Sequence, residues 1–180
     1  MNEAKLIQRA RRLEGQALAE IYDAHNEAIY RYALRLLGDE SLAEDCVSET
    51  FARFLKVLSK GKGPREHLQA YLFRIAHNWI TDFYRRPAPE TRPIDDELGL
   101  AGDDDPARAA FENMQSRRTR AALAALTPDQ RAVITLKYLE GWRNAEIAAI
   151  LDKPIGAIKS LQHRALAALK RILLDEDNEQ

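Results

Sequence analysis

Four polar side chains near the C-terminal end of the chain have the chemistry and the spacing to bind a nucleic acid: Lys159, Ser160, His163 and Arg164. Each of them can donate hydrogen bonds, and their spacing places them on one side of a helix. Donors of this kind contact phosphate oxygens and base edges in the grooves of DNA. The pattern therefore predicts a DNA-binding helix. The plainer alternative is an ordinary amphipathic helix with a solvated, charged face.

The neighbouring residues predict the elements that would position these donors. Residues 144–151 have the periodicity of a short helix, Asp152 and Lys153 allow a turn, and Pro154 suits the first turn of a second helix. Gly156 has no Cβ and is expected to let the two helices approach closely. An apolar stripe opposite the donors would pack the second helix onto its domain: Ile158, Leu161, Ala165, Leu169 and Ile172. This layout is that of a helix-turn-helix, whose second helix enters the major groove.

The front part of the chain also has helical periodicity, and no segment alternates as a strand would. Gly38 is expected to end one helix in the left-handed conformation. Ser41 and Glu44 have the spacing of a capping box that opens the next helix, and Pro64 is expected to begin a third. The expected helices span residues 15–37, 41–58 and 64–86, with a basic, glycine-rich loop from residue 59 to Pro64.

The middle of the chain has the composition of a linker. Residues 90–105 hold seven acids against Arg92 alone, and proline and glycine recur from Pro87 to Pro106, so this segment cannot bury a core. Helices are expected to resume over residues 107–126. Thr127, Pro128 and Gln130 then signal another start, of a helix that ends at Gly141.

The predicted fold class is therefore all-α, with two small helical domains joined by a flexible acidic linker. The expected domains are residues 1–86 and residues 111–180, the second containing the helix-turn-helix, and the expected linker is residues 87–110.

Composition narrows the classes of protein. The chain is 46% hydrophobic and 31% charged and has no apolar run long enough to cross a membrane, so no membrane insertion is expected. Its N-terminus lacks the apolar core of a signal peptide, which makes the cytoplasm the expected compartment. The single cysteine, Cys46, excludes an internal disulfide, and its apolar neighbours predict a small buried side chain. The net charge of −1 conceals an asymmetry, because residues 142–171 hold six Lys or Arg against two acids.

The third expected helix carries a polar stripe opposite its apolar one. The stripe consists of Arg74, Asn78, Thr81 and Arg85, flanked by His77. Arg and Asn side chains bind phosphates and base edges. Aromatic residues at the same end, Trp79, Phe83 and Tyr84, have two interpretations: core packing, which is favoured for Trp79 and Phe83, or stacking on unpaired bases.

Taken together, three blocks of sequence resemble the sigma-70 family of bacterial RNA polymerase initiation subunits, specifically its small extracytoplasmic-function group. Residues 43–54, AEDCVSETFARF, resemble the segment of the family that binds the polymerase clamp. Residues 71–86, YLFRIAHNWITDFYRR, resemble its −10 element segment. Residues 126–164 resemble its −35 element domain. Each block alone is moderately specific, whereas their order over nearly the whole chain is highly specific.

The resemblance implies a role for particular residues. Those expected to bind core RNA polymerase at the β′ clamp are Glu44, Asp45, Glu49, Thr50 and Arg53. Those expected to bind the −10 element are Lys60, Lys62, Arg74, His77, Asn78, Thr81 and Arg85. Those expected to bind the −35 element are Arg143, Lys159, Ser160, His163 and Arg164.

The resemblance also implies the partners: core polymerase through its β′ clamp and β flap, promoter DNA, and an anti-sigma factor as a further candidate. No catalytic residue, cofactor or metal is expected. The acidic linker matches a segment that lies in the RNA path of the polymerase, where carboxylates can imitate nucleic acid; the alternative is a solvated spacer.

Some positions depart from the family pattern. Arg143 stands where the family often has a Ser or Thr cap, so Asn144 is expected to cap the helix one residue later. Ala157 replaces a common Thr and removes a phosphate contact. These departures leave the domain type intact and the promoter sequence open.

Three other functions compete with this interpretation. An enzyme is disfavoured because the sequence has no phosphate-binding glycine-rich loop, nucleophile elbow or His-Glu-x-x-His motif. A stand-alone helix-turn-helix regulator would need the front part as a dimerisation or ligand domain. An interaction protein, such as a sigma decoy, would bind polymerase without initiating transcription. Transcription in vitro with core polymerase separates all of these.

Overall fold

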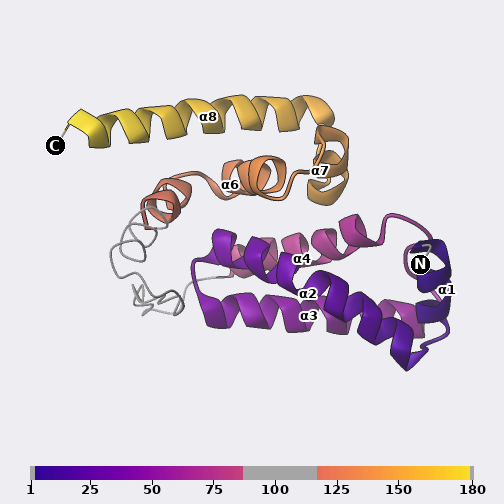
Figure 1. Cartoon of the computed structure of the whole chain (residues 1–180). Coiled ribbons are helices and arrows are strands. Elements are labelled where there is room, and N and C mark those ends of the chain that lie inside the picture. The colour runs from indigo at the N-terminus through magenta and orange to yellow at the C-terminus, as the bar shows by residue number, and fades with distance from the viewer. Residues whose placement is uncertain (1–2, 87–116, 179–180) are drawn as a thin grey trace, which may run out of the picture.

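The computed structural model describes residues 3–86 and 117–178, with side chains described as far as residue 174. The described residues form helices and their connections, without a strand (Figure 1). The front lobe, residues 3–86, contains α1 (Glu3–Arg11), α2 (Gly15–Leu37), α3 (Glu40–Ser59) and α4 (Leu68–Arg85). The rear lobe, residues 117–178, contains helical residues 117–124, α6 (Pro128–Ile134), the π-helix η1 (Thr135–Leu139), α7 (Asn144–Leu151) and α8 (Ile155–Asn178).

The front lobe is a bundle in which α2 packs against both α3 and α4. The apolar stripe of α2 fills its centre, and Gly38 ends that helix with a φ of +70°, as predicted. Tyr32, Phe54 and Phe73 are among its largest fully buried side chains. Burial of one such side chain stabilises the folded chain by about 1.5–3 kcal/mol. This core holds α3 and α4 side by side, and both carry predicted site residues.

Two predicted helix starts in the front lobe are wrong. α3 is capped by Asp39, whose carboxylate accepts from the backbone N–H of Leu42 at 2.8 Å, so Ser41 is not the cap. α4 begins at Leu68 rather than Pro64, because His67 adopts a left-handed φ of +55°. The backbone N–H of Leu68 donates to the carboxylate of Glu3 at 2.9 Å. That acid belongs to α1, a nine-residue helix that was not predicted.

In the rear lobe the predicted elements are largely confirmed. Thr127 and Gln130 form the capping box of α6, with Pro128 at its first position. The helix-turn-helix consists of α7, a turn in which Asp152 has a φ of +54°, and α8. Two details are wrong. Arg143, not Asn144, is the cap residue of α7, and its backbone N–H donates to Glu146 at 2.8 Å.

The second wrong detail concerns Gly156. A Cβ built there meets nothing within 4 Å, so this glycine does not serve a close helix approach.

The two lobes are packed against each other. α4 lies against α7, and α2 contacts both α6 and η1, so one apolar core runs through both lobes. At the junction the rings of Phe73 and Trp142 meet edge to face, 5.2 Å apart. Figure 1 shows α6 and α7 between α4 and α8, with α8 on the side away from the front lobe. The acidic linker, predicted over residues 87–110, lies outside the described residues.

Candidate nucleic-acid and polymerase interfaces

The predicted DNA-binding side of α8 is exposed. We call Lys159, Ser160, His163 and Arg164 the α8 face; all four are exposed, while Ile158, Leu161 and Ala165 on the opposite side are buried. The amphipathic pattern therefore orients the helix as predicted. Arg164 donates weakly to the carbonyl of Ser160 at 3.4 Å, so its guanidinium remains available to an anion. Arg143, at the start of α7, is also exposed.

A second basic surface lies in the front lobe between α3 and α4. There a groove of about 300 Å³ is lined by Arg53, Lys56, Lys60 and Asn78, with Val57 and Ile75 as apolar walls. Cations beside an amide and an apolar wall suit a nucleotide, because the phosphate, the base edge and the base face each find a partner. Lys60 and Asn78 were predicted for this purpose. We call this surface the α3–α4 groove.

The groove also contains residues that were missed or assigned elsewhere. Lys56 was not predicted, although it lies four residues before Lys60, the spacing at which two side chains share one side of a helix. Arg53 was assigned to polymerase binding, but it lines the groove and donates to Glu49 at 2.8 Å. Lys62 is exposed in the loop after α3 but does not line the groove.

The remaining predicted −10 residues lie at the junction with the rear lobe. The guanidinium of Arg74 is 3.6 Å from the carboxylate of Asp152. Thr81, which is half-buried, and Arg85, which is exposed, line a cavity of about 180 Å³ together with Pro128 and Asp129 of the rear lobe. The structure thus divides the predicted −10 residues into those at the groove and those at the lobe junction.

His77 is a core residue in this conformation, contrary to its prediction as a DNA contact. Only 8% of it is exposed, and its Nδ1 lies 2.9 Å from the hydroxyl of Tyr32. Burial lowers the pKa of His77 to about 4; Asp129 opposes this shift and Lys153 adds to it. At neutral pH the ring is therefore neutral and stabilises the bundle through its hydrogen bond.

The predicted polymerase-binding acids lie on the outer side of α3. Glu44 and Asp45 are exposed, and Glu49 is partly exposed. Thr50 is fully buried, and its hydroxyl donates to the carbonyl of Cys46 at 2.7 Å, so it is a core residue rather than a contact residue. Thr50 directly precedes buried Phe51 and lies three residues after buried Val47, so helical periodicity could have predicted that its side chain faces the core.

Cys46 is buried, as predicted. Burial raises the pKa of its thiol to about 12, which leaves it protonated and unreactive at neutral pH. None of the described helices is long and apolar enough to cross a membrane.

The described residues thus carry two separated basic surfaces, one on a helix-turn-helix and one on a helical bundle. Comparison with known proteins identifies the kind of protein. Residues 21–88 match the family model of sigma-70 region 2, and residues 116–169 match that of sigma-70 region 4. The chain belongs to the sigma-70 family of RNA polymerase sigma factors.

Its relatives agree with that assignment. The chain is 36% identical over 172 residues to the ECF RNA polymerase sigma factor SigL of Mycobacterium tuberculosis, covering 90% of this chain and 95% of SigL. It is 31% identical over 174 residues to the ECF RNA polymerase sigma factor BldN of Streptomyces coelicolor, covering 96% of this chain and 66% of BldN. Among solved structures it is similar to CnrH in complex with the cytosolic domain of CnrY. The TM-score is 0.73 at 26% identity, and the match covers 97% of this chain and 98% of CnrH.

Proposed function

We propose that this chain is a bacterial transcription initiation factor that binds core RNA polymerase and directs it to specific promoters. The observation that carries the proposal is the presence of sigma-70 region 2 and region 4, in that order, on the two lobes with the exposed basic surfaces. It performs no covalent chemistry itself and acts in the cytoplasm, where bacterial polymerase works.

The two basic surfaces have different tasks in this proposal. The α8 face binds the −35 element as duplex, because a helix with exposed donors fits the major groove. The α3–α4 groove binds the −10 element as it opens, because its apolar walls and its amide suit an unstacked base.

In this proposal, binding to core polymerase depends on acidic side chains of α3. Glu44 and Asp45 are exposed on α3 and would pair with a positively charged β′ clamp. The rear lobe would contact the β flap. An anti-sigma factor is a further proposed partner, supported by the similar sigma factor RpoE of Bartonella quintana, which was solved in complex with the anti-sigma factor NepR. The acidic linker, in the same proposal, imitates RNA in the polymerase channel.

A stand-alone helix-turn-helix regulator is the weaker alternative. It explains the α8 face but not the region 2 match over residues 21–88. A regulator would bind duplex DNA without polymerase, whereas an initiation factor needs it.

The test is transcription in vitro with core polymerase and promoter fragments selected by the reconstituted holoenzyme. The parent should produce promoter-specific transcripts. Reversal of the two exposed acids, Glu44→Lys with Asp45→Lys, should weaken core binding and reduce transcription while the helical circular dichroism is unchanged. Asp23→Lys, an exposed acid on α2, is the matched control.

Promoter-specific binding by the isolated protein, with no transcription in the presence of core polymerase, would favour the stand-alone regulator. Core binding without transcription would favour a decoy.

A further inference from the structure

We propose that α1 braces the connection between α3 and α4, and that Arg11 and Glu3 of this helix are positioning residues for the α3–α4 groove. Residues 60–67 form this connection, which we call the groove loop. α1 precedes residue 21, where the match to sigma-70 region 2 begins, so the matched region does not include it. The consequence for DNA rests on the proposed function, in which the groove binds the −10 element, whereas the brace itself can be measured independently.

The groove loop connects the two helices that carry the groove. Lys60, its first residue, lines the groove together with Arg53 and Lys56 of α3. Asn78, which also lines the groove, belongs to α4, and that helix starts directly after the loop. A shift of the loop therefore moves Lys60 relative to Asn78. Figure 1 shows α1 at the same end of the front lobe as this connection.

The backbone of the groove loop has an unusual conformation. Gly61, Gly63 and His67 have positive φ angles of +68°, +118° and +55°. A Cβ at Gly63 would lie 2.9 Å from Cδ2 of the buried Leu58, so the loop passes close to the core at this point. A non-glycine residue such as His67 keeps a left-handed conformation only where the surrounding structure imposes it. The conformation of the loop thus depends on its contacts with other elements.

Arg11 makes such a contact at the start of the loop. Its Nη2 donates to the carbonyl of Gly61 at 3.0 Å, and its Nη1 donates to the carbonyl of Gly63 at 3.5 Å. A guanidinium is planar and carries its donors in a fixed fork, so the two carbonyls that it binds are held at a defined separation. Gly61 follows Lys60 directly, so the fork fixes the backbone beside a residue that lines the groove.

Glu3 makes a contact at the other end of the loop. Its carboxylate accepts from the backbone N–H of Leu68, the first residue of α4, at 2.9 Å. His67 precedes the helix, and its side chain forms no capping hydrogen bond, so Glu3 takes the place of a local cap. Side chains of a single helix therefore hold both ends of the groove loop.

α1 is itself fixed to the front lobe. Ile7 and Ala10 are buried in the core. Arg9 pairs with Glu14 at 2.8 Å and with Glu20 of α2 at 3.4 Å. A helix that is anchored to the core on one side and bonded to the loop on the other can hold the loop in place. α1 therefore has the contacts that a brace requires.

The experiment compares Arg11→Ala with Arg12→Ala in the full-length protein. Both variants remove one positive charge at the end of α1, but Arg12 is exposed, whereas the loop carbonyls accept from Arg11. Amide hydrogen exchange of the free protein measures the protection of residues 61–68. In the holoenzyme reconstituted with core polymerase, permanganate reactivity measures the rate at which the −10 element opens.

Arg11→Ala should accelerate exchange in the loop and slow promoter opening by on the order of tenfold, because charge-assisted hydrogen bonds no longer hold the loop. Core affinity and −35 duplex binding should stay as in the parent, and Arg12→Ala should match the parent throughout. Arg11→Lys keeps the charge but lacks the planar fork, so it should recover opening only in part. Glu3→Ala, at the other end of the loop, should reproduce both defects.

Unchanged exchange of residues 61–68 in both Arg11→Ala and Glu3→Ala would overturn the brace. Faster exchange with promoter opening equal to that of Arg12→Ala would overturn its role at the groove, and full recovery by Arg11→Lys would overturn the role of the fork. If Arg11→Ala loses helical circular dichroism, Glu3→Ala decides the first two questions. Failure of the proposed function is distinguishable, because the parent holoenzyme would then produce no promoter-specific transcripts, while loop exchange in the free protein would still respond to Arg11→Ala.

Discussion

The two proposed DNA-binding surfaces of this protein differ in how close the other lobe lies to them. The α8 face is wholly exposed, because α8 lies on the side of the rear lobe away from the front lobe (Figure 1). The predicted −10 residues of α4 are divided between the α3–α4 groove and the junction with the rear lobe, where Arg74 and Arg85 are exposed and Thr81 is half-buried. The polar stripe of a single helix can therefore lie in two different environments. Accessibility depends on what the rest of the chain packs against it.

The two surfaces also differ in whether their arginines already form an ion pair. Within the described residues Arg164 forms no ion pair, whereas Arg74 already lies 3.6 Å from Asp152. A phosphate that approaches Arg74 must compete with that carboxylate, although the pair is exposed and its net energy is small. A phosphate at Arg74 would therefore meet a carboxylate competitor within the described residues, whereas a phosphate at Arg164 would not.

The largest predicted effect separates the two surfaces by substitution. Lys159→Ala with Arg164→Ala should weaken −35 duplex binding by the holoenzyme, by roughly 1–3 kcal/mol for each base that is no longer read, and reduce the salt dependence of binding. Lys60→Ala with Asn78→Ala should instead impair promoter opening and leave duplex binding intact. Fluorescence anisotropy with duplex DNA and permanganate footprinting of the −10 region measure the two steps.

Lys170→Ala serves as the control for removal of charge on α8, since Lys170 is exposed but lies beyond the α8 face. If both double variants impair the same step, the division of labour between the surfaces is wrong.

A smaller effect concerns pH and the buried side of α4. The pKa of His77 in the folded chain is about 4, below the ordinary 6.5, so the unfolded chain binds the additional proton between these values. Folding stability should therefore fall as the pH drops from 6.5 toward 4, by roughly 3 kcal/mol in total. Urea unfolding at a series of pH values measures how the free energy of unfolding changes with pH.

His77→Asn keeps an acceptor near the hydroxyl of Tyr32 and should flatten this part of the profile. His163→Asn, at an exposed position of α8, should leave it as in the parent. A profile of equal slope in the parent and His77→Asn would show that His77 is not the titrating group.

The smallest predicted effect concerns α6, the helix of the rear lobe that lies at the junction with the front lobe. Thr127→Ala removes the cap of α6, the helix that carries Asp129 and Arg131 to the junction, and should cost about 1 kcal/mol of stability. Thr127→Ser retains the hydroxyl and should cost much less. Denaturant midpoints measure the difference. Equal stability of the parent and the alanine variant would mean that the cap contributes nothing in this context.

Much of the local structure was predictable from the sequence. The apolar stripe of α8 determined which side of that helix is exposed, since Ile158, Leu161 and Ala165 have no other way to be buried together. Gly38 and Thr127 marked helix ends because their preferences act within a few residues. The same periodicity could have placed Thr50 and His77 inward, had the resemblance to the family not favoured a contact role.

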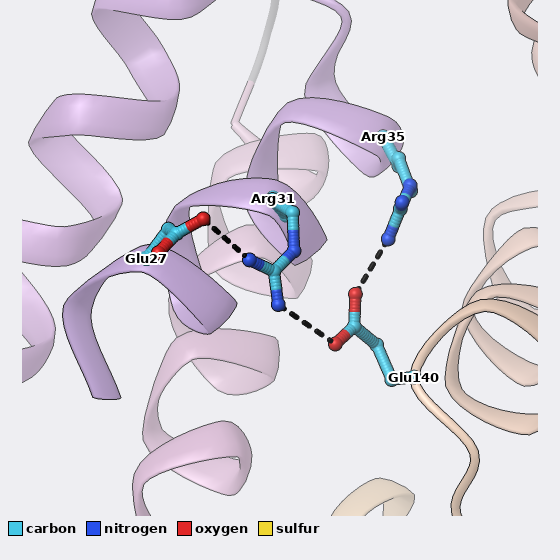
Figure 2. Close-up of polar contacts among 4 residues, drawn as sticks. All are labelled: Glu27, Arg31, Arg35 and Glu140. Atoms are coloured by element: carbon cyan, nitrogen blue, oxygen red, sulfur yellow. Dashed lines mark hydrogen bonds and ion pairs between the residues drawn. The ribbon is translucent and has the colours of Figure 1, made fainter. Parts of the chain in front are cut away.

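What the sequence could not show depends on residues far apart in the chain. The start of α4 is capped by Glu3, 65 residues earlier. Glu140 in the rear lobe pairs with Arg31 and Arg35 of α2, more than 100 residues earlier in the chain (Figure 2). Helix periodicity determines which face of a helix is apolar, because adjacent turns share one backbone ladder. It does not specify which apolar face meets which, so the junction of the lobes and the pairing of Arg74 with Asp152 were decided only by tertiary packing.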